Sequence, residues 1–123
     1  MLGRVDAAAA LAELTDISPQ IRRVVVVGAD GAIVGSNAPE TSAAEHLAER
    51  GLRLAVEADE VRGDHVSQLE AATGEGSVFV VRDDGRTIIA TTRAEPTVGL
   101  VFYDLKTALR SIDTGTEAHD AAS

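Results

Sequence analysis

The spacing of hydrophobic and polar positions changes several times along this chain, and each change indicates a new secondary-structure element. Near the N-terminus, from about Arg4 to Thr15, apolar residues recur three and four positions apart, which is typical of an amphipathic helix. Asp6 lies near the start of this segment, where a carboxylate is stabilised by the helix dipole. Ser18-Pro19 ends the helix, because the residue before proline avoids the α region. The repeating apolar positions are Ala7, Ala10, Leu11 and Leu14.

The next stretch, RRVVVVGADGAIVGSN over residues 22–37, allows two interpretations. A dinucleotide-binding loop requires G-x-G-x-x-G between a strand and a helix. Gly28, Gly31 and Gly35 do not have this spacing, and no helical stripe follows them. Asp30-Gly31 between two apolar runs instead indicates a β-hairpin, in which a type I′ turn places both central residues at positive φ. We therefore expect a strand, a tight turn and a second strand.

A long second helix is predicted from Ser42 to about Val61. Ser42 as N-cap and Glu45 three residues later form a capping box, and Gly63 suits the C-cap region. Gly51 in the middle destabilises the helix by about 1 kcal/mol relative to alanine. Such a glycine usually reflects the close approach of another backbone, and a partner helix is one candidate.

Three strands follow. The segment from His65 to Thr73 mixes polar and apolar residues, as an edge strand does. Apolar strands are then expected at 77–82 and 87–92, joined by a hairpin turn at 83–86, so the three strands form a meander. Val24–Val27 and Val78–Val81 show no polar face, which indicates that helices cover both surfaces of the sheet centre. The pattern predicts an α/β fold with element order α-β-β-α-β-β-β-α and three layers.

After Pro96, apolar residues from Val98 to Ile112 recur at helical spacing and predict a final helix. Residues 1–112 are expected to form one domain, since 123 residues with 45% apolar content suffice for one core. From Asp113 onward the chain is small, polar and acidic, which predicts a disordered tail over residues 113–123.

Composition narrows the classes of partner. The net charge of −9 and the 2% aromatic content oppose nucleic-acid binding, which needs cationic side chains and stacking platforms. No apolar run is long enough to span a bilayer, so membrane insertion is not expected. The chain has no cysteine. The N-terminal segment carries acidic residues and lacks a long apolar run, so no signal peptide is expected. We expect a cytoplasmic protein.

No catalytic, cofactor-binding or metal-binding constellation emerges from the sequence. The histidines show no ligand spacing, the serines beside glycines lie outside G-x-S-x-G, and the acidic pairs suit solvated charge and turn chemistry. This absence favours an interaction module over an enzyme. The residues considered are His46, His65 and His119, Ser36 and Ser77, and the pairs Asp59-Glu60 and Asp83-Asp84.

Three segments, VVVVGADGAIVGSN, GSVFVVRDDGRTIIATT and PTVGLVFYDLKTAL, occur in an order and spacing that resembles the Roadblock domain of the Roadblock and dynein light chain family, as found in bacterial members. The resemblance extends from about Leu11 to Ile112. It implies a profilin-like sandwich with a five-stranded antiparallel sheet, the middle helix on one face and the terminal helices on the other.

The resemblance also implies a function. Members of the family are non-enzymatic platforms that bind or regulate small Ras-like GTPases, as activators or scaffolds. They form homodimers in which the middle helices pack together and the third strands join the two sheets. An alternative function is a small-molecule sensor that uses a pocket between sheet and helices. The expected dimer interface comprises Leu47, Gly51, Leu54, Ala58, Val61, Val66, Gln68 and Leu69.

Overall fold

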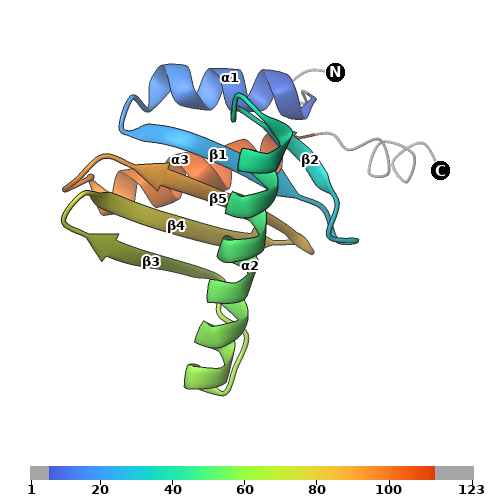
Figure 1. Ribbon diagram of the computed structural model, residues 1–123, viewed down its shortest axis with the longest axis vertical. Helices are drawn as coiled ribbons and strands as arrows, with labels where there is room; N and C mark the ends of the chain where they lie inside the picture. Colours follow the sequence, from blue (N-terminus) through green and yellow to red (C-terminus); the bar gives the residue numbers. More distant parts are fainter. Residues whose placement is uncertain (1–5, 113–123) are drawn as a thin grey trace.

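The computed structural model describes residues 6–112, which form one five-stranded sheet flanked by helices (Figure 1). The elements follow the order predicted from the sequence. The predicted tail at 113–123 lies outside the described residues. In chain order the elements are α1 (Ala7–Ile17), β1 (Ile21–Val27), β2 (Ile33–Ser36), α2 (Thr41–Arg62), β3 (Gln68–Thr73), β4 (Gly76–Asp83), β5 (Arg86–Thr92) and α3 (Val98–Ser111).

The sheet has the strand order β2-β1-β5-β4-β3, and every neighbouring pair is antiparallel. The first hairpin therefore joins the second group of strands through β1 and β5, leaving β2 and β3 at the edges. Helix α2 covers one face, and α1 and α3 cover the other (Figure 1). The profilin-like three-layer arrangement expected from the resemblance is confirmed.

The strand pattern follows from which side chains each face buries. Val24 and Val26 pack under α1 and α3, whereas Val25 and Val27 pack under α2. All four valines are at most 1% exposed, because β1 is a central strand with helices on both sides. The prediction that both sheet surfaces are covered is confirmed for β1. Within residues 6–112, no helix combines the length and the apolar character needed to cross a membrane.

The helix starts differ from the predictions in one instructive case. Asp6 does cap α1, accepting a hydrogen bond from the Ala9 amide at 2.8 Å. The capping box at Ser42 is wrong, because α2 begins at Thr41 with Glu40 as N-cap and without a side-chain cap. The Glu40 carbonyl already accepts from the amides of Ala43 and Ala44. The first turn therefore closes before Ser42 could act as a cap.

The two hairpin turns differ in geometry, and only the second has the type I′ geometry that was predicted for the first. At Asp30-Gly31 only the glycine has positive φ, at 87°, so the predicted type I′ turn is wrong there. The Asp30 carboxylate accepts from the Ala32 amide at 3.0 Å, and the register of β1 and β2 shifts at Val26/Val27. Asp84 and Gly85 have φ of 57° and 80°, the pattern of a type I′ turn. A two-residue loop requires this twist, whereas the longer first loop does not.

Candidate interaction surface

Helix α2 crosses the sheet and continues beyond the edge formed by β3 (Figure 1). Small residues line its sheet-facing side, and Ala55 is the last of them to be buried. Residues 56–62, which we call the overhang, are half-buried or exposed. At about 1.5 Å per residue, the overhang adds about 10 Å of helix outside the core. The buried residues of α2 are Ala44, Ala48, Gly51 and Ala55.

Gly51 is explained within the chain itself. A Cβ at this position would lie 2.6 Å from Cδ1 and Cγ1 of Ile89, in the central strand β5. Such a distance is too short for real carbon atoms, so the glycine allows α2 to lie close to the sheet. The close approach of α2 to the sheet therefore accounts for Gly51 without a partner helix, and its place in the expected dimer interface stays a prediction.

Four further apolar residues of α2 lie along one side of the helix, and we call this stripe the apolar flank. Its residues are spaced seven, four and three apart, so they share one side of the helix. Val61 is 85% exposed, and the others are half-buried. Leu47 packs against the same core cluster as Leu69 of β3, so the flank and the edge strand border one core. The apolar flank consists of Leu47, Leu54, Ala58 and Val61.

Strand β3 is the sheet edge beside this flank. It pairs with β4 on one side, and its other side has no partner strand among the described residues. Gln68 begins the strand and is exposed, whereas Leu69 is half-buried. The strand contains no proline or lysine, the residues that commonly protect edges from pairing. Its backbone is therefore suited to adding another strand.

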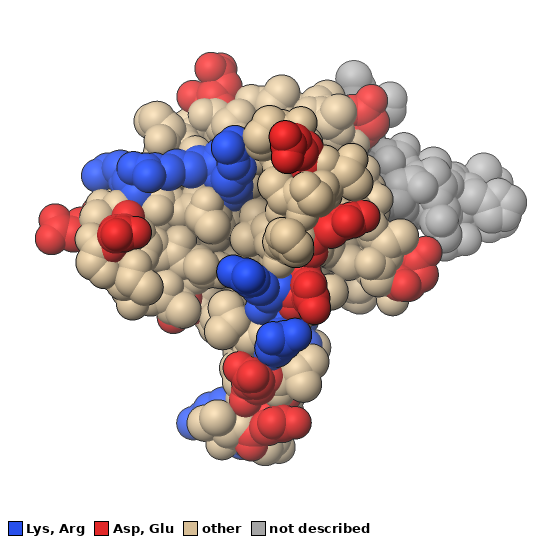
Figure 2. Space-filling view, in the orientation of Figure 1, with Lys and Arg blue, Asp and Glu red and all other residues tan. Residues whose placement is uncertain are grey.

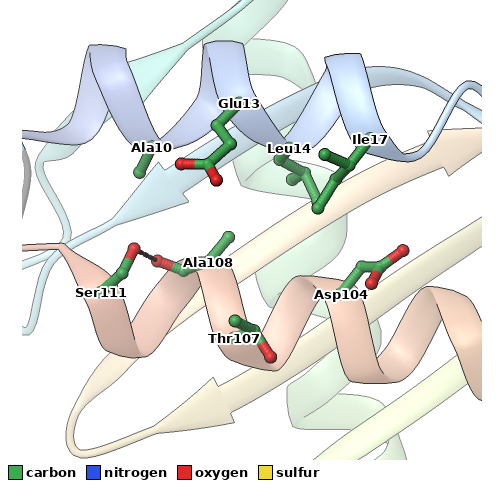
Figure 3. A pocket seen from close by; sticks show the side chains of 8 residues that line it. All are labelled: Ala10, Glu13, Leu14, Ile17, Asp104, Thr107, Ala108 and Ser111. Atoms are coloured by element: carbon green, nitrogen blue, oxygen red, sulfur yellow. Dashed lines mark hydrogen bonds between the residues drawn. The ribbon is translucent and has the colours of Figure 1, made fainter. Parts of the chain in front are cut away.

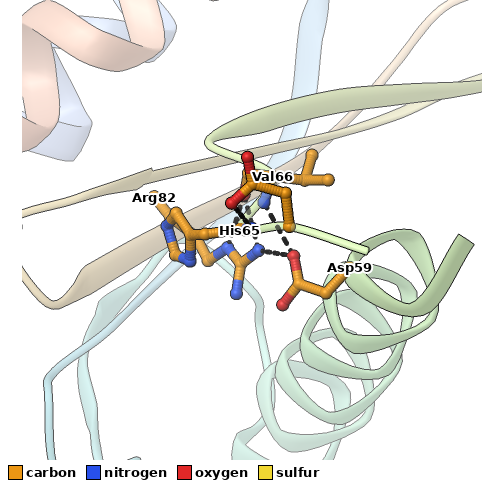
Figure 4. Close-up of polar contacts among 5 residues, drawn as sticks. Asp59, His65, Val66 and Arg82 are labelled. Carbon is orange, nitrogen blue, oxygen red and sulfur yellow. Dashed lines mark hydrogen bonds and ion pairs between the residues drawn. The ribbon is translucent and has the colours of Figure 1, made fainter. Parts of the chain in front are cut away.

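A cluster of polar contacts anchors the loop between the overhang and β3 (Figure 4). The Arg82 guanidinium donates to the Asp59 carboxylate at 2.5 Å and to the Val66 carbonyl. The same carboxylate oxygen accepts from the Val66 amide at 2.7 Å. These two hydrogen bonds, first that of Arg82 and then that of Val66, hold the pKa of Asp59 below its usual value of 3.8.

Two of the four acidic residues in these pairs make contacts beyond the predicted solvated charge and turn chemistry. Asp59 fixes the base of the overhang, and Asp83 accepts a hydrogen bond from Arg110 at 2.7 Å. Val66, which was expected in the dimer interface, lies half-buried in the anchored loop and not on the apolar flank. The partner Arg82 carried no local sequence signal, because it is distant from Asp59 along the chain.

On the opposite face of the sheet, a groove of about 260 Å³ runs between α1 and α3 (Figure 3). Apolar side chains such as Leu14 and Ala108 line it, and Glu13 and Asp104 come from opposite walls. Ligand sites commonly occupy about 300–1,000 Å³. The groove is thus slightly small for a metabolite, and both of its charged residues are acidic.

Metal chemistry receives no support in residues 6–112, where no three histidine, aspartate or glutamate side chains converge on a common point. His46 lies in α2 and His65 in the loop before β3, and both are exposed. His119 lies outside the described residues.

Sequence reasoning missed one apolar residue beside the flank. Val78 of β4 is half-buried and packs against the same cluster as Leu47 and Leu69. Its position in a strand with no polar face suggested full burial. Only the pairing of β4 with the edge strand β3 could have indicated that Val78 is partly exposed. Its partner Ala71 is too small to cover it.

No protein-family model matches the chain, and neither does any curated protein sequence. Solved structures do match. A Roadblock/LC7 domain from Streptomyces avermitilis superposes with a TM-score of 0.75 and 18% identity, covering 87% of this chain and 94% of that one. The gliding protein MglB from Thermus thermophilus superposes with a TM-score of 0.68 and 14% identity, covering 88% and 86%.

A more distant similarity reaches the profilins. LokiProfilin2, in its complex with rabbit actin, has a TM-score of 0.53 and 13% identity, covering 83% of this chain and 92% of that one. The stronger matches cover most of both chains. The chain therefore has the fold of the Roadblock/LC7 domains, as its sequence motifs predicted.

Proposed function

We propose that this protein is a cytoplasmic, non-enzymatic homodimer that binds or regulates a small Ras-like GTPase. The observation that carries the proposal is that the apolar flank of α2 and the unpaired edge strand β3 border the same core cluster. In a single copy, the apolar flank is exposed to solvent, and the outer edge of β3 has backbone donors and acceptors without a partner strand. One partner molecule can satisfy both.

A second copy satisfies both by twofold symmetry. In such a dimer the two β3 strands pair antiparallel, and the two α2 helices lie side by side with their apolar flanks in contact. Leu54 lies in the middle of the flank and so near the symmetry axis. Among the similar structures, one is described as MglB with a tetrameric arrangement, so self-association occurs on this fold.

The first test concerns the dimer. Size exclusion with light scattering at tens of micromolar protein should give twice the mass of the chain. Leu54→Arg should give a monomer that remains folded, because a charge would be buried in an apolar contact. Val56→Arg is the matched control, since Val56 is exposed on the other side of the same helix. A monomeric wild-type protein would contradict the proposed dimer.

The second test concerns the partner. A Ras-like GTPase encoded beside this gene is the natural candidate. Its GTP hydrolysis and its binding to this protein should be measured in the GDP and GTP states, with wild type and with Leu54→Arg. We expect binding in at least one nucleotide state. No binding in either state would exclude that GTPase and weaken the proposal.

A further inference from the structure

A β-bulge places two neighbouring arginines on the surface beside α2. In the pairing of β1 with β5, Ile21 lies opposite Thr92 and Arg23 opposite Thr91, so Arg22 is the extra residue. Ile21 and Val24 are both buried under α1 and α3, and the bulge between them leaves Arg22 and Arg23 exposed. Arg23 lies two residues before Val25, which packs under α2, so it belongs to the α2 face.

A third arginine, Arg93, lies directly after β5. The Arg93 amide donates to the Gln20 carbonyl at 3.0 Å, which places Arg93 beside the start of β1. Figure 2 shows basic side chains (blue) gathered there, to the left of α2. Within residues 6–112, none of the three has a carboxylate partner. We call Arg22, Arg23 and Arg93 the arginine patch; it stands out in a chain of net charge −9.

The overhang of α2 carries the opposite charge. Residues 56–62 include Glu57, Asp59 and Glu60 against one basic residue, Arg62. Asp59 is engaged by Arg82, whereas Glu57 and Glu60 are exposed and have no ion pair among the described residues. The chain thus has an unbalanced basic patch and an unbalanced acidic helix end on the same face of the sheet.

The proposed dimer brings these two features together, and this step rests on that dimer. A twofold axis at the β3 edge, perpendicular to the sheet, keeps both α2 helices on one face. The overhang of each copy then lies above the sheet of the other. Its length of about 10 Å spans about two strand spacings. The overhang of the second copy therefore extends over β3 and β4, on the α2 face and towards β5 and β1, beside which the arginine patch lies.

We propose that the arginine patch of one copy holds the acidic end of α2 from the second copy, so that the contact forms twice in each dimer. The apolar flanks supply contact area, and the charges select the antiparallel arrangement of the helices. A parallel arrangement would bring acidic overhangs together and leave both arginine patches without partners.

A charge exchange between two variants tests this contact. The first variant is Arg22→Glu/Arg23→Glu, and the second is Glu57→Arg/Glu60→Arg. In a homodimer of either variant, like charges face each other at both contacts. Its dimer dissociation constant, measured by sedimentation equilibrium, should therefore be at least tenfold higher than that of wild type. An equimolar mixture should form a heterodimer of near wild-type affinity, because both contacts then join opposite charges.

Circular dichroism should show that each variant is folded, and recovery in the mixture excludes misfolding as the cause of weak association. Arg110→Glu, in α3 on the opposite face of the sheet, is the control for charge reversal outside the contact and should dimerise like wild type. If wild type dimerises and both variants do so equally well, the inference is wrong while the proposed dimer stands. If the mixture does not recover, the inference is also overturned. A monomeric wild type would refute both.

Discussion

The two faces of the sheet are built differently. Under α1 and α3, large side chains such as Phe79, Leu11 and Leu105 are at most 2% exposed, and Phe79 meets Phe102 edge to face at 4.9 Å. Under α2 the helix contributes only alanines and Gly51, and the leucines at its margins remain half-buried. The α1/α3 face is thus covered by large side chains of the same chain. The second is thin and exposes apolar surface along one margin.

This difference indicates that the two faces serve different purposes. Stability comes mainly from burial of large apolar side chains, so the α1/α3 face should contribute most of the free energy of unfolding. The α2 face gives up such burial because its helix lies close to the sheet, which leaves Leu54 and Val61 available to a partner. A protein that works by association needs a face of this second kind.

The largest expected effect comes from truncating a leucine on the closed face. Leu105→Ala should lower the free energy of unfolding by about 2–5 kcal/mol, because it leaves a cavity in a fully buried site. Leu47→Ala on the open face should lower it by about 1 kcal/mol. Urea denaturation in the Leu54→Arg background removes any contribution from association. Equal losses would contradict the contrast between the faces.

A smaller effect is expected where α2 approaches the sheet. Gly51→Ala should lower the free energy of unfolding by about 1 kcal/mol, since the clash with Ile89 outweighs the gain in helix propensity. Gly99→Ala in α3 is the matched control, because no atom lies within 4 Å of the added Cβ. It should stabilise the protein by up to about 1 kcal/mol. Stabilisation by both substitutions would show that α2 can move away from the sheet.

The smallest effect concerns the anchor of the overhang. The pKa of Asp59 is lowered on folding, so its contribution is fully present above the unfolded value of 3.8 and disappears as pH falls through the folded value. Asp59→Asn should therefore lose stability at neutral pH and show a shallower decline between pH 3.8 and lower values. Thermal unfolding from about pH 7 to about pH 2 measures both. An unchanged acid profile would mean that Arg82 does not hold Asp59 in solution.

Local rules predicted some features and failed at others for identifiable reasons. The periodicities of α1 and α3 located both helices, because each buries a simple stripe. Ser42 was misassigned as a cap because a capping motif cannot show that Glu40 already closes the turn. Asp30-Gly31 and Asp84-Gly85 have the same two residues, but their turns differ in geometry because the two loops differ in length. For the surface, spacing placed Leu47, Leu54, Ala58 and Val61 on one flank, but it could not show that Gly51 lies against Ile89.

By itself the sequence determined the order of elements, the layered class and the apolar stripes, because these follow from periods within short segments. Only the tertiary structure decided that Gly51 faces Ile89, that Arg82 holds Asp59, and that a bulge groups Arg22 and Arg23 with Arg93. Each of these contacts joins residues from different elements. Periodicity reports that a side chain is buried or exposed, but strand pairing and helix placement decide which other side chain it meets.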